Sequence, residues 1–214
     1  MRFFGKNISC IRGERLVFSD LNFSIEPGNA LIITGNNGSG KTSLLRLMAG
    51  LSRPASGHIN WQDGAIWDDP ETHHIRLHFI GHLTALKSTL SVKENLETWS
   101  HLHGGRKKDI VGTIKKLNLE GLEDTHCQNL SAGQKQRASL ARLAANDAPL
   151  WLLDEPTTAL DAMSVDLLNS MIKKHIKGGG ICVIATNTGL NVENCLELNM
   201  QDFAADPKHG GKIL

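Results

Sequence analysis

Residues 35–42 have the composition of a loop that binds phosphate groups. Three glycines let the backbone fold around a phosphate with its N–H groups pointing inward. Lys41 has the spacing that reaches the β- and γ-phosphates of a nucleotide, and the hydroxyl of Thr42 can ligate Mg²⁺. A glycine-rich turn that binds nothing is the alternative, but a buried strand before the loop and a helix after it favour a nucleotide site. The loop residues are Gly35, Asn36, Asn37, Gly38, Ser39, Gly40, Lys41 and Thr42.

Two adjacent carboxylates, Asp154 and Glu155, follow the apolar run Leu150–Leu153. A buried strand of a parallel sheet presents such residues at its carboxyl end, where ligands bind. Asp154 is predicted to hold Mg²⁺ through water, and Glu155 to orient or deprotonate an attacking water. Acidic residues commonly end strands, so the pair alone is weak evidence. Downstream of a phosphate loop, it indicates hydrolysis of a nucleotide.

A third motif, Leu130–Gln134, precedes a helix predicted from Gly133 to Asn146. Taken alone, Ser131 and Gln134 are best interpreted as a capping box. Together with the phosphate loop and the carboxylates, the motif resembles the signature of the ABC ATPases, here with alanine at its third position. The signature residues are Ser131, Ala132, Gly133 and Gln134, and Asp161 resembles the D-loop aspartate of that family.

The resemblance implies a head-to-tail dimer that holds two ATP molecules with Mg²⁺. Ser131 and Gly133 of one copy would cap the γ-phosphate held by Lys41 of the other. A second helix N-terminus would thus neutralise phosphate charge only when the dimer closes. ATP binding would therefore hold the two copies together, and hydrolysis would loosen them.

The order of apolar runs predicts the elements that position these residues. Strands alternate with helices, which is typical of a mainly parallel sheet with crossover helices. The predicted fold is α/β, a P-loop NTPase of the ABC ATPase type with an antiparallel β subdomain and an inserted helical subdomain at about 90–146, in one domain over 1–214. Before the helical subdomain, the expected elements are a strand pair over Phe3–Ile25, a strand Ala30–Thr34, a helix Lys41–Ala49 and a strand-rich segment Ser52–Phe79. Helices are expected over Ser91–Asn146, starting at a Ser91–Glu94 capping box and broken at Gly104–Gly105, near Gly121 and near Asn129. A strand Leu150–Asp154, a helix Ser164–Lys177 and a strand Ile181–Thr186 are expected to follow.

Composition narrows the class of protein. The 214 residues carry 23 Lys and Arg against 22 Asp and Glu, a formal net charge of +1, so charge gives no case for nucleic-acid binding. No apolar run approaches the roughly 18 residues that cross a bilayer. Met1–Lys6 is too short and too charged for a signal peptide, so we expect a cytoplasmic location. Four scattered cysteines lack CxxC spacing and indicate neither disulfides nor a zinc site.

Further segments resemble the ATPase subunit of the cytochrome c maturation haem exporter. The resemblance implies that ATP hydrolysis is coupled to haem delivery for periplasmic cytochrome c assembly. It also implies integral membrane partners and a peripheral location on the cytoplasmic face of the inner membrane. Alternatives are the ATPase of another lipid or small-molecule ABC transporter, a translation or DNA-repair ABC protein, and an assembly subunit that binds ATP but barely hydrolyses it. The matching segments are Cys10–Arg15, Gly50–Pro54 with Trp61–Gln62, Phe79–His82, Leu86–Lys87, Leu130–Gln134, Gly179–Ile181 and Leu190–Val192.

Three positions depart from the usual ABC pattern. Arg12 replaces the aromatic residue that stacks on adenine, although a flat guanidinium can also stack on a base. His82 stands where a glutamine usually links Mg²⁺ to the membrane subunits. Asn187 stands where a switch histidine is expected, and it can donate a hydrogen bond to the γ-phosphate but cannot carry a positive charge. Its presence predicts slow hydrolysis with intact nucleotide binding.

The histidines invite a metal- or haem-binding hypothesis. His74, His78 and His82 are four residues apart, a spacing that brings side chains together only on a helix. We interpret this region as strand and loop, so these residues are not predicted to form a ligand set. The four tryptophans are interpreted as packing residues.

Overall fold

Five parallel strands form the central sheet in a computed structural model of the chain, which describes residues 1–102, 109–145, 147–187, 192 and 195–204. In spatial order they are β6 (Leu77–Ile80), β7 (Leu150–Asp154), β8 (Ile181–Ala185), β3 (Ala30–Thr34) and β9 (Cys195–Asn199). Every residue of β7 and β8 is buried. Strands that are covered on both faces are apolar along most of their length, without the alternation of apolar and polar residues seen in half-exposed strands. Both β7 and β8 have this continuous apolar pattern. The predicted strands at β3 and β7 have the observed bounds, and β8 ends one residue earlier than expected.

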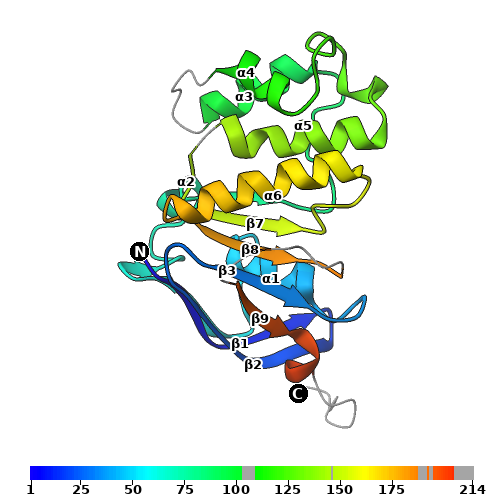
Figure 1. Ribbon diagram of the computed structural model, residues 1–214. Coiled ribbons are helices and arrows are strands. Elements are labelled where there is room, and N and C mark those ends of the chain that lie inside the picture. Colours follow the sequence, from blue (N-terminus) through cyan, green and yellow to red (C-terminus); the bar gives the residue numbers. More distant parts are fainter. Residues whose placement is uncertain (103–108, 146, 188–191, 193–194, 205–214) are drawn as a thin grey trace.

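A separate antiparallel sheet lies beside the parallel one (Figure 1). Its strands, in spatial order, are β2 (Arg15–Ile25), β1 (Phe3–Arg12), β4 (Ser56–Trp61) and β5 (Gly64–Ala65). The β1–β2 connection turns at Gly13, whose φ of 61° is readily adopted only without a side chain. The predicted strand pair over residues 3–25 is therefore present.

Helix α1 (Lys41–Met48) packs between the two sheets. Its apolar residues Leu44, Leu45, Leu47 and Met48 are almost fully buried in one hydrophobic core with Phe3 and Ile33. The helix ends at Met48, with Ala49 as its C-cap, and Gly50 follows with a φ of 70°. This core joins the antiparallel sheet to one face of the parallel sheet, so the start of α1 is held rigidly at the edge where β3 ends.

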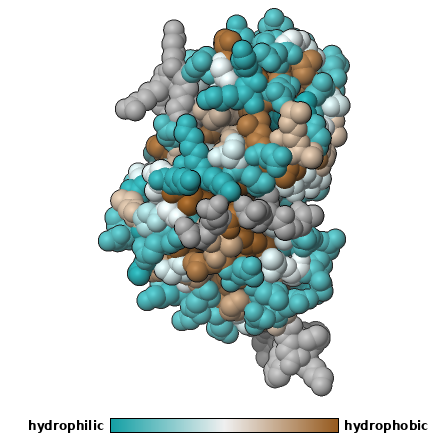
Figure 2. All heavy atoms as spheres, in the orientation of Figure 1, coloured by the Kyte–Doolittle hydropathy of each residue, from teal (hydrophilic) through white to brown (hydrophobic). Residues whose placement is uncertain are grey.

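The opposite face of the parallel sheet is covered by helices (Figure 1). A second core includes Leu140, Leu153, Leu168, Ile172 and Ile184. On the face shown in Figure 2, polar side chains cover the outer parts, and apolar residues gather across the middle over the parallel sheet. The helices are α3 (Val92–Leu102), α4 (Ile110–Lys116), α5 (Ala132–Ala145) and α6 (Ala162–Lys177), and a short 3₁₀ turn covers Cys127–Asn129.

Helix α3 begins at the predicted capping box. The backbone N–H of Ser91 donates to Glu94 Oε2 at 2.7 Å, and the N–H of Glu94 donates to Ser91 Oγ at 3.2 Å. The reciprocal bonds satisfy two donors that a helix start leaves unpaired. The break predicted at Gly104–Gly105 and the helix end predicted at Asn146 lie outside the described residues.

Helix α2 (Pro70–Ile75), strand β9 and a short 3₁₀ helix over Met200–Phe203 were not predicted. Helix α2 interrupts the segment expected to be strand and loop, so that expectation is wrong there. Asp69 starts the helix by accepting a hydrogen bond from the Thr72 N–H at 3.0 Å. Strand β9 pairs in parallel with β3 at the edge of the sheet. All three are short, and none has a long apolar period that marks it in the sequence.

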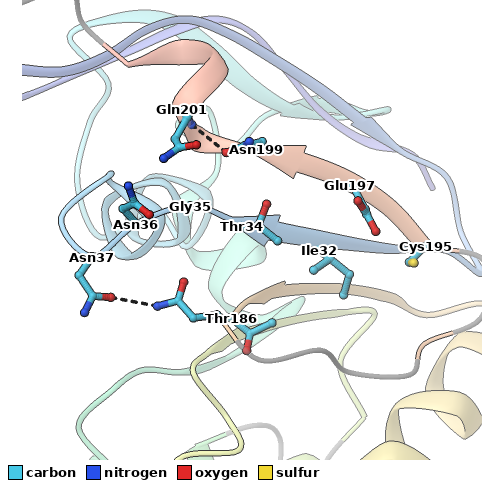
Figure 3. Close-up of a pocket in the computed structure, with 11 residues that line it drawn as sticks. Ile32, Thr34, Gly35, Asn36, Asn37, Thr186, Cys195, Glu197, Asn199 and Gln201 are labelled. Carbon is cyan, nitrogen blue, oxygen red and sulfur yellow. Dashed lines mark hydrogen bonds between the residues drawn. The ribbon is translucent and has the colours of Figure 1, made fainter.

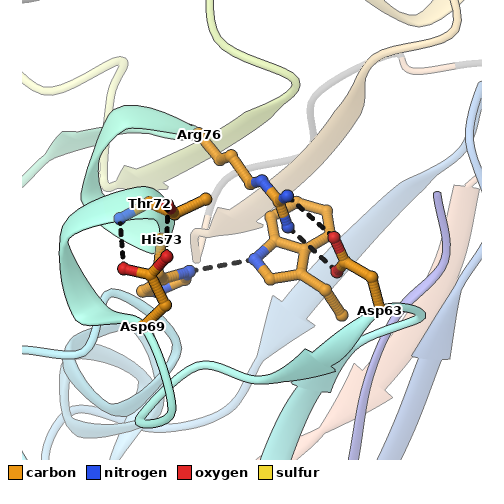
Figure 4. A network of polar contacts seen from close by, with 6 residues as sticks. Asp63, Asp69, Thr72, His73 and Arg76 are labelled. Atoms are coloured by element: carbon orange, nitrogen blue, oxygen red, sulfur yellow. Dashed lines mark hydrogen bonds and ion pairs between the residues drawn. The ribbon is translucent and has the colours of Figure 1, made fainter.

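A buried histidine on α2, His73, ties that helix to the antiparallel sheet (Figure 4) and to the last residue of α1. Trp61 Nε1 donates to His73 Nδ1 at 3.0 Å, and His73 Nε2 donates to the Met48 carbonyl at 2.9 Å. Beside this pair, the Arg76 guanidinium binds both carboxylate oxygens of Asp63 at 2.9 and 2.8 Å. Burial lowers the pKa of His73 from 6.5 to about 4. The neutral imidazole is therefore part of the folded structure.

This histidine predicts a loss of stability in mild acid. The unfolded chain takes up a proton near pH 6.5 and the folded chain only near pH 4, so stability is complete above 6.5 and falls as the pH drops towards 4. The difference amounts to about 3 kcal/mol in the free energy of unfolding. His73→Gln, whose amide can still accept from Trp61 and donate to Met48, should remove that much of the pH dependence in denaturant titrations. His74→Gln, at an exposed neighbour, is the control; an equal flattening in both variants would contradict the assignment.

Candidate functional site

The loop of residues 35–40 connects the end of β3 to the start of α1. Gly40 has a φ of 101°, and a Cβ there would approach Val17 Cγ1 to 2.8 Å and Phe18 Cδ1 to 3.0 Å. The antiparallel sheet therefore packs so closely against the loop that no larger residue fits. The loop and the N-terminus of α1 together form a concave, positively polarised backbone of the kind that binds phosphate.

Lys41 projects back over this loop. Its side chain is almost fully buried, at 7% exposure. The ammonium donates to the Gly35 carbonyl at 2.6 Å and to Asn187 Oδ1 at 2.9 Å, with a longer contact of 3.5 Å to the Asn36 carbonyl. These acceptors hold the charge at the centre of the loop, where a phosphate group can also reach it.

Thr42 and Asp154 meet directly across the two motifs. The Thr42 hydroxyl donates to Asp154 Oδ2 at 2.8 Å, and Asp154 is 2% exposed at the end of β7. A hydroxyl and a carboxylate are the hard oxygen donors that Mg²⁺ prefers. Since both lie beside the phosphate loop, the pair fits a Mg²⁺ ion that accompanies a nucleotide.

Glu155 follows in an unusual backbone conformation. Its φ of 47° lies in the left-handed region, which costs a residue with a side chain about 1–2 kcal/mol. The backbone N–H donates to the Ala185 carbonyl of β8 at 2.8 Å. This turn directs the chain away from the sheet immediately after Asp154, so that the two adjacent carboxylates take different surroundings.

Asn187 lies between the two halves of the site. It follows β8 by two residues, and β8 separates β3 from β7 in the sheet. Besides accepting from Lys41, its side-chain amide donates through Nδ2 to Asn37 Oδ1 at 2.9 Å. Its backbone N–H donates to Glu155 Oε2 at 3.4 Å. The structure thus places Asn187 in contact with both Lys41 and Glu155.

A cavity of about 920 Å³ opens beside this network, along the length of β9 and the carboxyl ends of β3 and β8 (Figure 3). Three of its polar residues, Glu197, Asn199 and Gln201, were not predicted as part of the site. The alternation of Leu196 and Leu198 with polar neighbours is the sequence signal that could have identified the strand. The lining residues are Ile32, Thr34, Gly35, Asn36, Asn37, Thr186, Asn187, Cys195, Glu197, Asn199 and Gln201.

His82 reaches the site from another side. It is exposed and lines a cavity of about 490 Å³ together with Thr42 and Asp154. His82 thus shares this cavity with the Thr42–Asp154 pair. His74 lies on α2 and His78 on β6. Within the described part of the chain, no group of three histidine, cysteine or acidic residues is placed to hold a metal ion.

Arg12 lies at the end of β1, where its Nε donates to Ser43 Oγ at 3.4 Å. Ser43 belongs to the first turn of α1, next to Lys41 and Thr42. The guanidinium is therefore close to the phosphate loop, on the side formed by the antiparallel sheet.

The motif Ser131–Gln134 forms the capping box at the start of α5. The Ser131 N–H donates to Gln134 Oε1 at 2.8 Å, and the Gln134 N–H donates to Ser131 Oγ at 3.2 Å. Ala132 is exposed, and a Cβ on Gly133 would lie 3.0 Å from the Ala159 carbonyl. No hydrogen bond among the described residues joins this motif to the loop of residues 35–42 of its own chain. Ser131 and Ala132, at the start of α5, are exposed, whereas Gly133 and Gln134 are half-buried.

Asp161 caps α6 by accepting from the Ser164 N–H at 2.8 Å. Its carboxylate also lies 3.7 Å from Arg137 Nη1 on α5. The hydrogen bonds from Ser164 and, less strongly, the charge of Arg137 lower the pKa of Asp161. The contact links α6 to the helix that begins with the capping motif.

No helix among the described residues is long and apolar enough to cross a membrane.

A family model described as ABC transporter matches residues 18–158. A Rhodospirillum rubrum protein named cytochrome c biogenesis ATP-binding export protein CcmA is 45% identical over 211 residues, covering 99% of this chain and 91% of the relative. A Paramagnetospirillum magneticum protein of the same name is 46% identical over 208 residues, covering 94% and 95%. Among solved structures, the dimeric ATP-binding cassette MJ0796, bound to ADP and Pi, is 25% identical with a TM-score of 0.76 and covers 87% of this chain and 88% of that one.

Proposed function

Since this chain belongs to the ABC transporter family and, within it, to the cytochrome c biogenesis ATP-binding export proteins, we propose that it hydrolyses ATP to drive haem export for cytochrome c assembly. The observation that carries the chemical part is the convergence of Lys41, the Thr42–Asp154 pair and Glu155 at one edge of the parallel sheet. The names of the relatives support the transport part of the proposal, which is export for cytochrome c biogenesis.

In the proposed reaction, residues 35–40 and Lys41 bind the phosphates of ATP. Thr42 and Asp154 hold Mg²⁺, which when bound supplies positive charge against the phosphate oxygens. Glu155 orients the attacking water and accepts its proton. Arg12 lies on the side of the site where the adenine would bind, and His82 lies on the side of Thr42 and Asp154.

Two copies are proposed to act together, each supplying the exposed N-terminus of α5 to the nucleotide bound by the other. Ser131, Ala132, Gly133 and Gln134 would then complete the phosphate site, with Asp161 beside the same interface. The exposure of Ser131 and Ala132 supports the arrangement, and so does the dimeric state of the MJ0796 cassette. A helix N-terminus adds about half a positive charge beside the terminal phosphate.

The transport part is tested with the membrane subunits of the same system. The chain should co-purify with them from the membrane fraction, on its cytoplasmic face, and deletion of its gene should abolish mature c-type cytochromes. Restoration of these cytochromes by the wild-type chain, but not by Glu155→Gln, would separate a hydrolysing motor from a scaffold. Full restoration by Glu155→Gln would contradict the proposal.

A second candidate is an assembly subunit that binds ATP with very slow turnover, and Asn187 is the observation that favours it. An imidazole at this position can donate to the terminal phosphate with a positive charge, and an amide cannot. Loss of one such charge-stabilising donor typically slows an enzyme by roughly 10²–10³-fold.

Asn187→His is therefore expected to raise kcat of the assembled transporter with little change in KM. This pattern marks an interaction gained mainly in the transition state. Steady-state ATPase assays of both forms with the membrane subunits present provide the measurement. If kcat stays within about twofold while Glu155→Gln abolishes turnover, Asn187 does not limit the rate.

A further inference from the structure

The amide of Asn187 uses both of its polar atoms within the site. Its oxygen accepts from Lys41 Nζ, and its nitrogen donates to Asn37 Oδ1, each at 2.9 Å. The opposite orientation would turn the amide NH₂ towards an ammonium group, which has no acceptor. The two partners therefore fix the amide in one orientation, and Figure 3 shows the bond to Asn37.

This arrangement occupies a position that a terminal phosphate needs. Lysines at the Lys41 position contact the β- and γ-phosphates, and Glu155 is placed to hold the water that attacks the γ-phosphate. Asn187 contacts both residues, through its side chain and its backbone N–H respectively. A γ-phosphate between them would bring its oxygens against the oxygen of the Asn187 amide, and two acceptors repel each other.

A bound triphosphate must therefore turn this amide so that its NH₂ faces the phosphate. The rotation breaks the bonds to both Lys41 and Asn37. A diphosphate has no γ-phosphate and leaves the amide in place. On the basis of the proposed function, we propose that Asn37 and Asn187 form a latch over Lys41 that only a terminal phosphate opens, with Asn37 as the positioning residue that sets its strength.

The latch makes triphosphate binding weaker than it would otherwise be and leaves diphosphate binding unchanged. Asn37→Ala removes one of the two bonds that must break, so the triphosphate should bind roughly fivefold more tightly, which corresponds to about 1 kcal/mol for one net hydrogen bond. In an Asn187→Ala background there is no latch, so adding Asn37→Ala should change the triphosphate and diphosphate affinities by the same factor. Asn36, Asn37 and Asn187 are exposed, so their substitution leaves the core intact.

The test is a double-mutant cycle read by titration of the purified chain with a fluorescent, non-hydrolysable ATP analogue and with the matching ADP analogue, both with Mg²⁺. Asn36→Ala is the matched control, because Asn36 contacts Lys41 only through its backbone carbonyl. Asn36→Ala should change each affinity by the same factor with and without Asn187→Ala. The latch is overturned if Asn37→Ala, in the otherwise wild-type chain, changes the triphosphate and diphosphate affinities by the same factor. It is also overturned if Asn37→Ala changes the triphosphate affinity equally with and without Asn187→Ala. A wild-type chain that binds neither analogue would contradict the proposed function itself.

Discussion

Replacement of Lys41 by alanine is expected to weaken MgATP binding at least about 100-fold, the equivalent of roughly 3 kcal/mol for the loss of charge-assisted hydrogen bonds. The ammonium lies buried over the phosphate loop and provides its central positive charge. Backbone N–H groups remain in the variant, but they carry only partial charges. The measurement is a direct nucleotide titration of the purified variant by calorimetry.

Lys93→Ala provides the control for this experiment, because Lys93 is exposed on α3. Its affinity should equal that of the wild type. The melting temperature of each variant without nucleotide identifies any loss of folding. If folded Lys41→Ala binds MgATP as the wild type does, the loop of residues 35–42 is not the phosphate site.

The second large effect is expected for Glu155→Gln, which should slow hydrolysis by roughly 10²–10⁴-fold. The amide keeps the shape of the side chain and can still accept the bond from the Asn187 N–H, but it cannot take a proton from water. Binding should persist, because Lys41, Thr42 and Asp154 are unchanged. The ATP-bound dimer should therefore accumulate.

Size-exclusion chromatography in MgATP, with and without the substitution, measures this accumulation, and a phosphate-release assay measures turnover. Glu120→Gln removes the same charge from an exposed position and should behave as the wild type. A monomeric Glu155→Gln variant with normal turnover would assign the proton acceptor to another residue.

Much of the fold was predictable because the sequence marks it with continuous apolar runs of strand length and with glycines. The strand Ala30–Thr34 is apolar and ends at Gly35, and its observed bounds match. The predicted fold class is confirmed by the two sheets and by the similarity to a solved ATP-binding cassette. Strand β9 was missed because an edge strand needs an apolar side chain only at alternate positions, and Leu198 is its only buried residue. The extent of the domain, 1–214, stays a prediction.

The linear motifs of the site were also predictable, whereas their connections were not. Spacing identifies Lys41, Asp154 and Glu155 within their own segments. The bonds from Asn187 to Lys41 and Asn37 join residues 146 and 150 positions apart. They depend on the order of β7, β8 and β3 in the sheet, which no local pattern reveals. The functional roles assigned to these residues stay predictions until the variants are measured.

The left-handed backbone at Glu155 limits which residues evolution can place there. Asparagine, aspartate and glycine adopt this conformation most easily, and β-branched residues are nearly excluded. Glutamate has no such advantage. Selection for a proton acceptor therefore favours glutamate at this position, whereas selection for low backbone strain favours other residues. In a descendant lineage that no longer hydrolyses ATP, only the second pressure remains, and position 155 should drift towards glycine or asparagine.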